Sequence, residues 1–263
     1  MIDIENAKKE LISHVRELKI DNSRVQAKLD HIIRVSEVSK KIATELKLPE
    51  EQIQLAELIG LLHDIGRFEQ YRIFNNNTSS ILLDNNNNNK KFDHGEAGVE
   101  VLKKDNYIRK YIEEDTYDDI IYAAVYEHNK YELTKGLSQE KELFCKIIKD
   151  ADKIDLIYEA IAIYWQEPER IKEIELGKLS EKMLENFYQH RLADNRNRIS
   201  ETDQILRFAS FIFDINFSYS FKILKESDNI SKMIDRFDYQ VPETKEEMMK
   251  VKTIAKEYIF SKV

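Results

Sequence analysis

Residues 49–67 read PEEQIQLAELIGLLHDIGR, an apolar stretch that ends in an adjacent histidine and aspartate. Its apolar residues recur every three or four positions, which is the α-helical period. Pro49 and the two acidic residues after it suit the first turn of a helix, and Gly66 can end it. The pair His63-Asp64 is therefore either a polar helix terminus or the centre of a site.

The helical period runs through most of the 263-residue chain, whose six glycines and three prolines offer little of the turn chemistry of a β protein. We therefore expect an all-α fold. We expect one domain, with a core over about residues 25–165 and additional C-terminal helices over about 169–263 packed on it. The other expected helices cover residues 5–18, 24–46, 93–104, 117–128, 138–165, 169–191, 200–225 and 243–261, and that at 93–104 begins with Asp93 as its N-cap.

Residues 75–91, NNNTSSILLDNNNNNKK, form a low-complexity segment. Asparagine competes with the helix backbone and tolerates turn conformations, so this segment is expected to be a surface loop. Both a lid over a site and a neutral insertion fit that expectation.

The formal net charge of −8 provides no global field that would attract nucleic acid or an anionic membrane. An anionic substrate would therefore need a local cation or a metal. Cys145 is the single cysteine, which excludes an intrachain disulfide and favours a buried apolar role. The N-terminus lacks the pattern of a signal peptide and no 18-residue apolar run occurs, so a cytoplasmic location is expected.

Several histidines fall on the apolar faces of the expected helices. His31, His63 and His128 each align with apolar residues one or two turns away, so each is expected to point inward. His14 and His190 pass the same test, and an inward histidine alone more often indicates a hydrogen-bonded core residue than a ligand. The neighbours of each histidine must therefore decide its role.

Asp64 follows His63 directly and lies one turn after Gly60, where a small residue permits a close helix approach. Burying the Asp64 carboxylate without a cation would be costly, so a metal or Arg67 must compensate its charge. Arg67 has the alternative of an ion pair with Glu69.

The segment KDADKID at 149–155 raises the same question. At least one of its aspartates should reach the interior, but periodicity does not choose between Asp150 and Asp152. The alternative is a charged helix flank in which these carboxylates pair with Lys149 and Lys153.

The order of His31, then His63-Asp64 in LLHDIGR, then DADKID resembles the HD superfamily of metal-dependent phosphohydrolases, which are helical proteins. The resemblance spans about residues 25–165. It implies that His31, His63, Asp64 and Asp152 ligate a divalent metal, and that Asp150 supports the ligands or forms a salt bridge.

Two further segments, DHGEAGVEVL at 93–102 and YEHNKYEL at 126–133, resemble the extra histidine motifs of superfamily members that hold two metals. By this resemblance His94 and His128 would ligate a second ion and Asp64 would bridge the two. A single metal, with these histidines in supporting roles, stays open. Imidazole and carboxylate ligands accept Mn, Fe, Ni, Zn, Co or Mg.

The activity that the resemblance implies is hydrolysis of a phosphomonoester or phosphodiester by a metal-bound hydroxide. Asp64 and Arg67 would act in catalysis, and Arg67 and Lys130 would neutralise the substrate phosphate. Lys130 also lies just past an expected helix end, where a cation suits the helix dipole. The expected partner is a small phosphorylated substrate such as a nucleotide, and a homo-oligomer formed through the aromatic-rich residues 205–224 stays open.

Two relatives within the superfamily limit this interpretation. The cyclic-dinucleotide phosphodiesterases called HD-GYP carry a Gly-Tyr-Pro signature that EHNKYELTKGL lacks, so activity on cyclic dinucleotides is not expected. Myo-inositol oxygenase and similar diiron enzymes share the order of ligands. A diiron oxygenase of that type and a non-catalytic, metal-binding regulatory HD module therefore remain alternatives.

Overall fold

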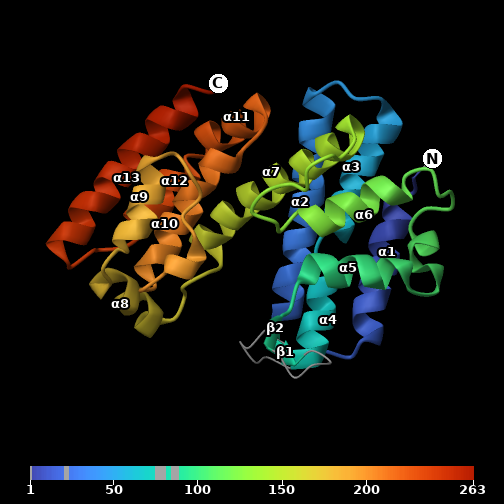
Figure 1. Cartoon of the computed structure of the whole chain (residues 1–263), viewed down its shortest axis with the longest axis horizontal. Helices are drawn as coiled ribbons and strands as arrows, with labels where there is room; N and C mark the ends of the chain where they lie inside the picture. The colour runs from blue at the N-terminus through green and yellow to red at the C-terminus, as the bar shows by residue number, and fades with distance from the viewer. Residues whose placement is uncertain (1, 21–23, 75–80, 84–88) are drawn as a thin grey trace. The chain divides into compact units, whose positions relative to one another are not determined.

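The computed structural model describes residues 2–20, 24–74, 81–83 and 89–263, and these residues are mainly α-helical (Figure 1). The prediction of an all-α fold is confirmed. The chain divides into two compact units, residues 1–151 and 152–263. This division lies inside helix α7 and therefore before residue 169, where the additional C-terminal helices were expected to begin. The prediction of a single domain stays a prediction.

The first unit is a set of helices packed around α3 and α5, with α1, α2 and α6 against α3 and with α4 and α6 against α5. Its elements are α1 (Ile4–Glu17), α2 (Arg24–Glu45), α3 (Glu50–Leu62), α4 (Ile65–Phe74), β1 (Ile81–Leu83), β2 (Asn89–Lys91), α5 (His94–Lys103), the 3₁₀ helix η1 (Lys104–Lys110), α6 (Asp118–Glu127) and the first turns of α7 (Gln139–Ala162).

Helix α3 is buried on all sides, from Leu55 to Leu62. A helix that is apolar all round belongs in a core, and neighbouring helices enclose this one. At Gly60 a Cβ atom would lie 2.4 Å from the Cα of Ser36 in α2, which confirms the predicted close helix approach. The core helix ends at Leu62, and His63 and Asp64, which follow it, are still buried.

Gly66 does not end the helix, and that prediction is wrong. Helix α4 begins at Ile65, and Gly66 lies in its first turn. A Cβ atom on Gly66 would lie 2.1 Å from the carbonyl oxygen of His94. The glycine therefore lets α4 contact the start of α5, which brings the Asp64 turn close to His94.

The expected helices at 5–18, 24–46, 117–128, 138–165 and 243–261 are confirmed to within a few residues at their ends. Asp93 is the N-cap of α5, as predicted: its side chain accepts hydrogen bonds from the backbone amides of Gly95 and Glu96. Capping side chains satisfy amides that have no partner within the helix.

Within the stretch at 75–91, expected to be a surface loop, the described residues form two short strands. β1 and β2 pair antiparallel, with Ile81 opposite Lys91. The apolar residues at 81–83 are the part of this segment suited to pairing in a strand. Residues 75–80 and 84–88 lie outside the described residues, so the lid interpretation is not tested.

The second unit contains α8 (Pro168–Leu176), α9 (Glu181–Tyr188), η2 (Asn195–Asn197), α10 (Thr202–Ser210), η3 (Phe211–Asp214), α11 (Ser218–Ser227), α12 (Asn229–Asp235) and α13 (Pro242–Phe260). Helix α10 packs against α8, α9, α12 and α13. The two long helices expected at 169–191 and 200–225 are wrong, because each is interrupted. Ser180 accepts a hydrogen bond from the amide of Met183 and so starts a new helix, a signal that the periodic pattern concealed.

Cys145 and Trp165 are buried, as expected. His190 is exposed, because α9 ends before it, and its ring stacks on Phe213 at 5.0 Å. The expectation that His190 points inward is therefore wrong. In the described part of the chain, every helix is too short or too polar to cross a membrane.

Candidate metal centre

The Asp64 carboxylate lies at the turn between α3 and α4, and its side chain is 5% exposed. Imidazoles from three helices of the first unit approach this carboxylate. His31 comes from the middle of α2, His94 is the first residue of α5, and His128 directly follows α6. Residues far apart in the sequence thus surround one buried acid, as the order of motifs predicted.

One carboxylate oxygen of Asp64 faces the histidines of the two extra motifs. Oδ1 lies 3.4 Å from Nε2 of His94 and 3.4 Å from Nε2 of His128, and these two nitrogens lie 3.1 Å apart. Ligand atoms about 2.1 Å from one ion lie roughly 3–3.5 Å from one another. Oδ1 is buried and accepts no hydrogen bond from the described residues. The three atoms therefore fit a cation.

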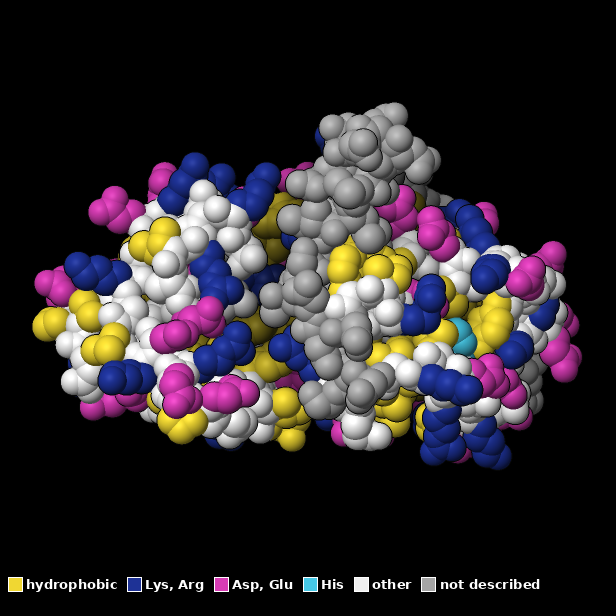
Figure 2. Space-filling model, turned by 90° about the horizontal axis from the view of Figure 1, so that it is seen from below, with side chains coloured by type: hydrophobic (Ala, Val, Ile, Leu, Met, Phe, Trp, Pro, Cys, Tyr) yellow, Lys and Arg dark blue, Asp and Glu magenta, His cyan; other side chains and the backbone are white. Residues whose placement is uncertain are grey.

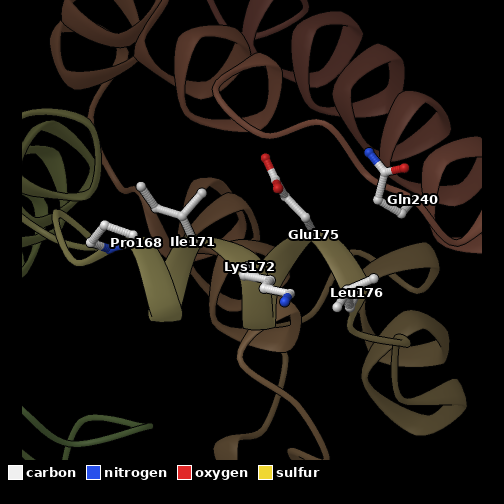
Figure 3. Close-up of a pocket in the computed structure, with 6 residues that line it drawn as sticks. All are labelled: Pro168, Ile171, Lys172, Glu175, Leu176 and Gln240. Carbon is white, nitrogen blue, oxygen red and sulfur yellow. The ribbon is translucent and has the colours of Figure 1, made fainter.

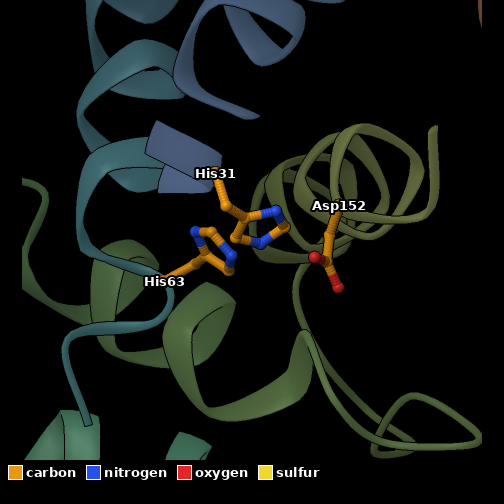
Figure 4. Close-up of side chains that lie close together, drawn as sticks. All are labelled: His31, His63 and Asp152. Atoms are coloured by element: carbon orange, nitrogen blue, oxygen red, sulfur yellow. The ribbon is translucent and has the colours of Figure 1, made fainter. Parts of the chain in front are cut away.

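The other oxygen faces a different pair. Asp64 Oδ2 lies 3.7 Å from Nε2 of His31 and 3.6 Å from Nε2 of His63. Ligand atoms of His31, His63 and Asp152 all lie within 4.8 Å of one another. Figure 4 shows the two rings beside each other and the Asp152 side chain extending from α7. These residues form a second group that could hold a metal.

The ring orientation of His63 and His128 is set by backbone carbonyls. Nδ1 of His63 lies 2.7 Å from the carbonyl oxygen of Gly60, and Nδ1 of His128 lies 2.7 Å from that of Val125. Because a carbonyl oxygen only accepts, each Nδ1 carries a proton, and Nε2 of each ring is the nitrogen directed at the Asp64 carboxylate. A metal-ligating imidazole is typically held in the same way, with one ring nitrogen on a backbone carbonyl and the other on the ion.

A family model of the HD domain matches residues 29–157. This chain contains an HD domain. The match includes every residue predicted as a metal ligand. HD domains bind divalent metals and are mostly metal-dependent phosphohydrolases. No curated protein and no solved structure matches the chain.

Lys28 is the main residue of this HD domain that the sequence analysis missed. Its Nζ donates to Asp64 Oδ2 at 2.8 Å, and its side chain is 13% exposed. Lys28 lies one helical turn before His31 and therefore on the same face of α2. That spacing could have identified it, because a buried carboxylate needs a cation nearby.

Arg67 is also close to the HD pair. Its Nε lies 3.6 Å from Asp64 Oδ1, and its Nη1 donates to Gln70 at 2.8 Å. Glu69, the alternative partner considered from the sequence, pairs with Arg72. Asp64 therefore has two cationic neighbours, one on each side of its carboxylate.

These neighbours determine the protonation of the site. Burial opposes ionisation of Asp64, but Lys28, His63, His128 and Arg67 together hold its pKa well below the ordinary range. Burial, aided by Arg67, lowers the pKa of His94 well below 6.5. An ionised carboxylate beside a neutral imidazole is the combination that binds a divalent metal.

Lys130, predicted to contact phosphate, forms an ion pair with Asp93 and lies over the ring of Tyr126 at 4.3 Å. The phosphate contact stays a prediction. Asp150 is fully buried, which confirms that at least one aspartate of residues 149–155 reaches the interior. Its supporting role stays a prediction.

The second unit has a surface groove whose lining includes none of the predicted site residues (Figure 3). Glu175 there accepts hydrogen bonds from the backbone amides of Asp238 and Gln240, through its side chain and its carbonyl oxygen respectively. These contacts tie two segments of the unit together and indicate a structural role. The groove is lined by Pro168, Ile171, Lys172, Glu175, Leu176 and Gln240.

Proposed function

We propose that this HD domain is a hydrolase of small phosphate esters that holds two divalent cations. The observation that carries the proposal is that the two carboxylate oxygens of Asp64 face different pairs of histidines. Oδ2 faces His31 and His63, and Oδ1 faces His94 and His128. A carboxylate that presents one oxygen to each of two imidazole pairs is suited to bridging two ions.

Each ion has its own ligands beside the shared carboxylate. His31, His63 and Asp152 would hold the first ion, and His94 and His128 would hold the second. Bound divalent cations supply an activated water and neutralise charge on the phosphate. Imidazole and carboxylate ligands favour first-row ions such as Mn, Fe, Co, Ni or Zn over an all-oxygen site for Mg.

Arg67 is the chain's own group for the phosphate. Its side chain is 33% exposed, so the guanidinium borders both the buried carboxylate and solvent. A guanidinium offers a fork of donors that matches two phosphate oxygens. We assign to Arg67 the orientation of the substrate phosphate and the stabilisation of charge that develops on its oxygens.

The surface charge supports a local mode of substrate capture. On the face shown in Figure 2, lysine and arginine side chains are interspersed with aspartate and glutamate side chains. Such a surface provides no broad positive field to steer an anion. The site itself must therefore hold the phosphate, which favours a small substrate, with nucleotides among the candidates.

The test is hydrolysis of p-nitrophenyl phosphate and bis(p-nitrophenyl) phosphate by the full chain with Mn²⁺. We expect hydrolysis that a chelator abolishes, and Arg67→Gln should reduce kcat/KM by about 100-fold, since one charged donor to the developing oxyanion is lost. Arg72→Gln is the matched control, because Arg72 pairs with Glu69 on the same helix and should leave kcat/KM unchanged.

Two outcomes would overturn the proposal. Iron-dependent oxygen consumption without hydrolysis would indicate a diiron oxygenase. Metal binding without either reaction, over a screen of nucleotides and phosphodiesters, would indicate a regulatory HD module.

A further inference from the structure

One carboxylate joins the two helices that present His94 and His128. Asp93 caps the start of α5, where its Oδ1 accepts from the amides of Gly95 at 2.9 Å and Glu96 at 3.2 Å. The same carboxylate accepts from Nδ2 of Asn129 at 2.8 Å and pairs with Nζ of Lys130. Asp93 is thus held both by residues that follow His94 and by residues that follow His128.

The contact continues to the imidazole of His94. Nδ2 of Asn129, which donates to Asp93, also lies 3.3 Å from Nδ1 of His94. A side-chain amide can donate to a bare ring nitrogen or, turned over, accept from a protonated one. Because the same Nδ2 donates to Asp93, the amide faces His94 as a donor, and Asp93 in turn fixes this orientation of Asn129.

The segment after His128 is fixed from a third direction. Lys149 of α7 is 2% exposed, and its Nζ donates to the carbonyl oxygen of Lys130 at 2.9 Å. A Cβ atom on Gly95 would lie 2.8 Å from the carbonyl oxygen of Tyr126, so the start of α5 and the end of α6 are in close contact. A small change in this contact would change the distance between the two imidazoles.

We propose that Asp93 is a positioning residue for the second ion: through Lys130 and Asn129 it sets the distance between His94 and His128. This inference rests on the proposed two-ion function. In it the ammonium of Lys130 acts as the ion-pair partner of Asp93. Groups that orient metal ligands typically affect metal affinity by about 10–100-fold. The first ion, held by His31, His63 and Asp152, does not depend on this contact.

The test separates the charge of Asp93 from its capping role. Asparagine caps helices as well as aspartate does, so Asp93→Asn keeps the start of α5 but loses the ion pair with Lys130. We expect calorimetric titration of the metal-free full chain with Mn²⁺ to show two sites in the wild type. In Asp93→Asn and Lys130→Met the weaker site should lose about 10–100-fold in affinity, and Lys130→Arg should restore it.

The matched control is Asp3→Asn, because Asp3 caps α1 through the amide of Asn6 at 2.9 Å. It should change neither affinity. If Asp93→Asn bound each ion with the same affinity as the wild type, this inference would be overturned and the proposed function would stand. An equal loss of affinity at both sites would have the same meaning. A wild type that binds fewer than two ions would overturn both.

Discussion

Asp64 in the first unit and Asp203 in the second are both buried acids, and they have different partners. The carboxylate of Asp203 accepts from three backbone amides, those of Ser180 at 2.9 Å, Ile199 at 2.8 Å and Ser200 at 3.3 Å. Asp64 is instead surrounded by ionisable side chains. Burial of an acid therefore does not mark a functional site by itself, and the partners distinguish a structural carboxylate from a candidate ligand.

The same difference extends to other polar groups of the second unit, the partly buried Arg236 and the buried Thr202. The guanidinium of Arg236 donates to four carbonyl oxygens at the end of α7, at distances from 2.8 to 3.1 Å. Thr202 donates to the carbonyl oxygen of Ile174 at 2.7 Å. These groups satisfy backbone atoms at helix ends, where the helix leaves them without partners.

Parallel substitutions of the two acids give the largest expected effect. Asp64→Asn removes the charge shared by both proposed ions, so the affinity for each should fall by more than about 100-fold. Asp203→Asn replaces an acceptor by a donor that faces backbone amides, which should cost about 1–3 kcal/mol of unfolding free energy. Titration with Mn²⁺ and urea unfolding of both variants measure these effects.

Asp64→Asn should therefore affect metal binding, whereas Asp203→Asn should affect stability. Asp203→Asn should bind both ions as the wild type does, at a temperature where it is folded. Weakened metal binding in Asp203→Asn, or unchanged binding in Asp64→Asn, would contradict the distinction between the two acids.

Most of the histidine and carboxylate neighbours of Asp64 could be predicted from the sequence. The helical period placed His31, His63 and His128 inward, and the resemblance to the HD superfamily added His94 and Asp152. Each of these predictions depends on a local pattern or on a motif. The structure brings all five residues into two of the groups that could hold a metal.

The contacts of long side chains could not be predicted in this way. Lys28 and Lys130 each have several bonds between the backbone and the charge, so their helical positions do not determine which carboxylate they reach. The breaks in the second unit were missed for a related reason. A polar cap such as Ser180 overrides an unbroken apolar period, because it satisfies amides that would otherwise be exposed.

Lys28 and Lys40 sharpen the comparison within one helix. Both extend from α2 to a buried carboxylate: Lys28 contacts Asp64 at 2.8 Å, and Lys40 contacts Glu57 at 2.9 Å. Lys28→Met should lower the stability of the metal-free chain by about 3 kcal/mol, since the buried charge of Asp64 loses its hydrogen-bonded partner and keeps only the more distant Arg67. It should also raise metal affinity by at least about tenfold, because an ammonium no longer competes for Oδ2.

Lys40→Met is the control, because Glu57 belongs to none of the groups of described residues that could hold a metal. Lys40 is half exposed, so the loss of stability should be about 1 kcal/mol or less, and metal affinity should not change. Weaker metal binding in Lys28→Met would instead show that Lys28 orients Asp64 for the ion.

The smallest expected effect is a pH dependence of the metal-free chain that comes from His94. Burial and then Arg67 lower its pKa well below 6.5 in the folded state, whereas the unfolded chain protonates it near 6.5. Above that pH both states are neutral at His94, and stability does not depend on it. Below that pH the unfolded state binds more protons, so the free energy of unfolding falls as the pH falls, by at most about 1.4 kcal/mol per pH unit.

Urea unfolding at pH 7, 6 and 5 in the presence of a chelator measures this dependence. His94→Gln should remove this contribution to the slope between pH 6 and 5 while leaving the capped start of α5 in place. Arg67→Gln should reduce the slope by a smaller amount, because burial still disfavours the imidazolium when the neighbouring charge is gone. Equal slopes in the wild type and His94→Gln would show that His94 gains a proton as readily in the folded chain as in the unfolded one, and that the carboxylate of Asp64 then binds an imidazolium at the position proposed for the second ion.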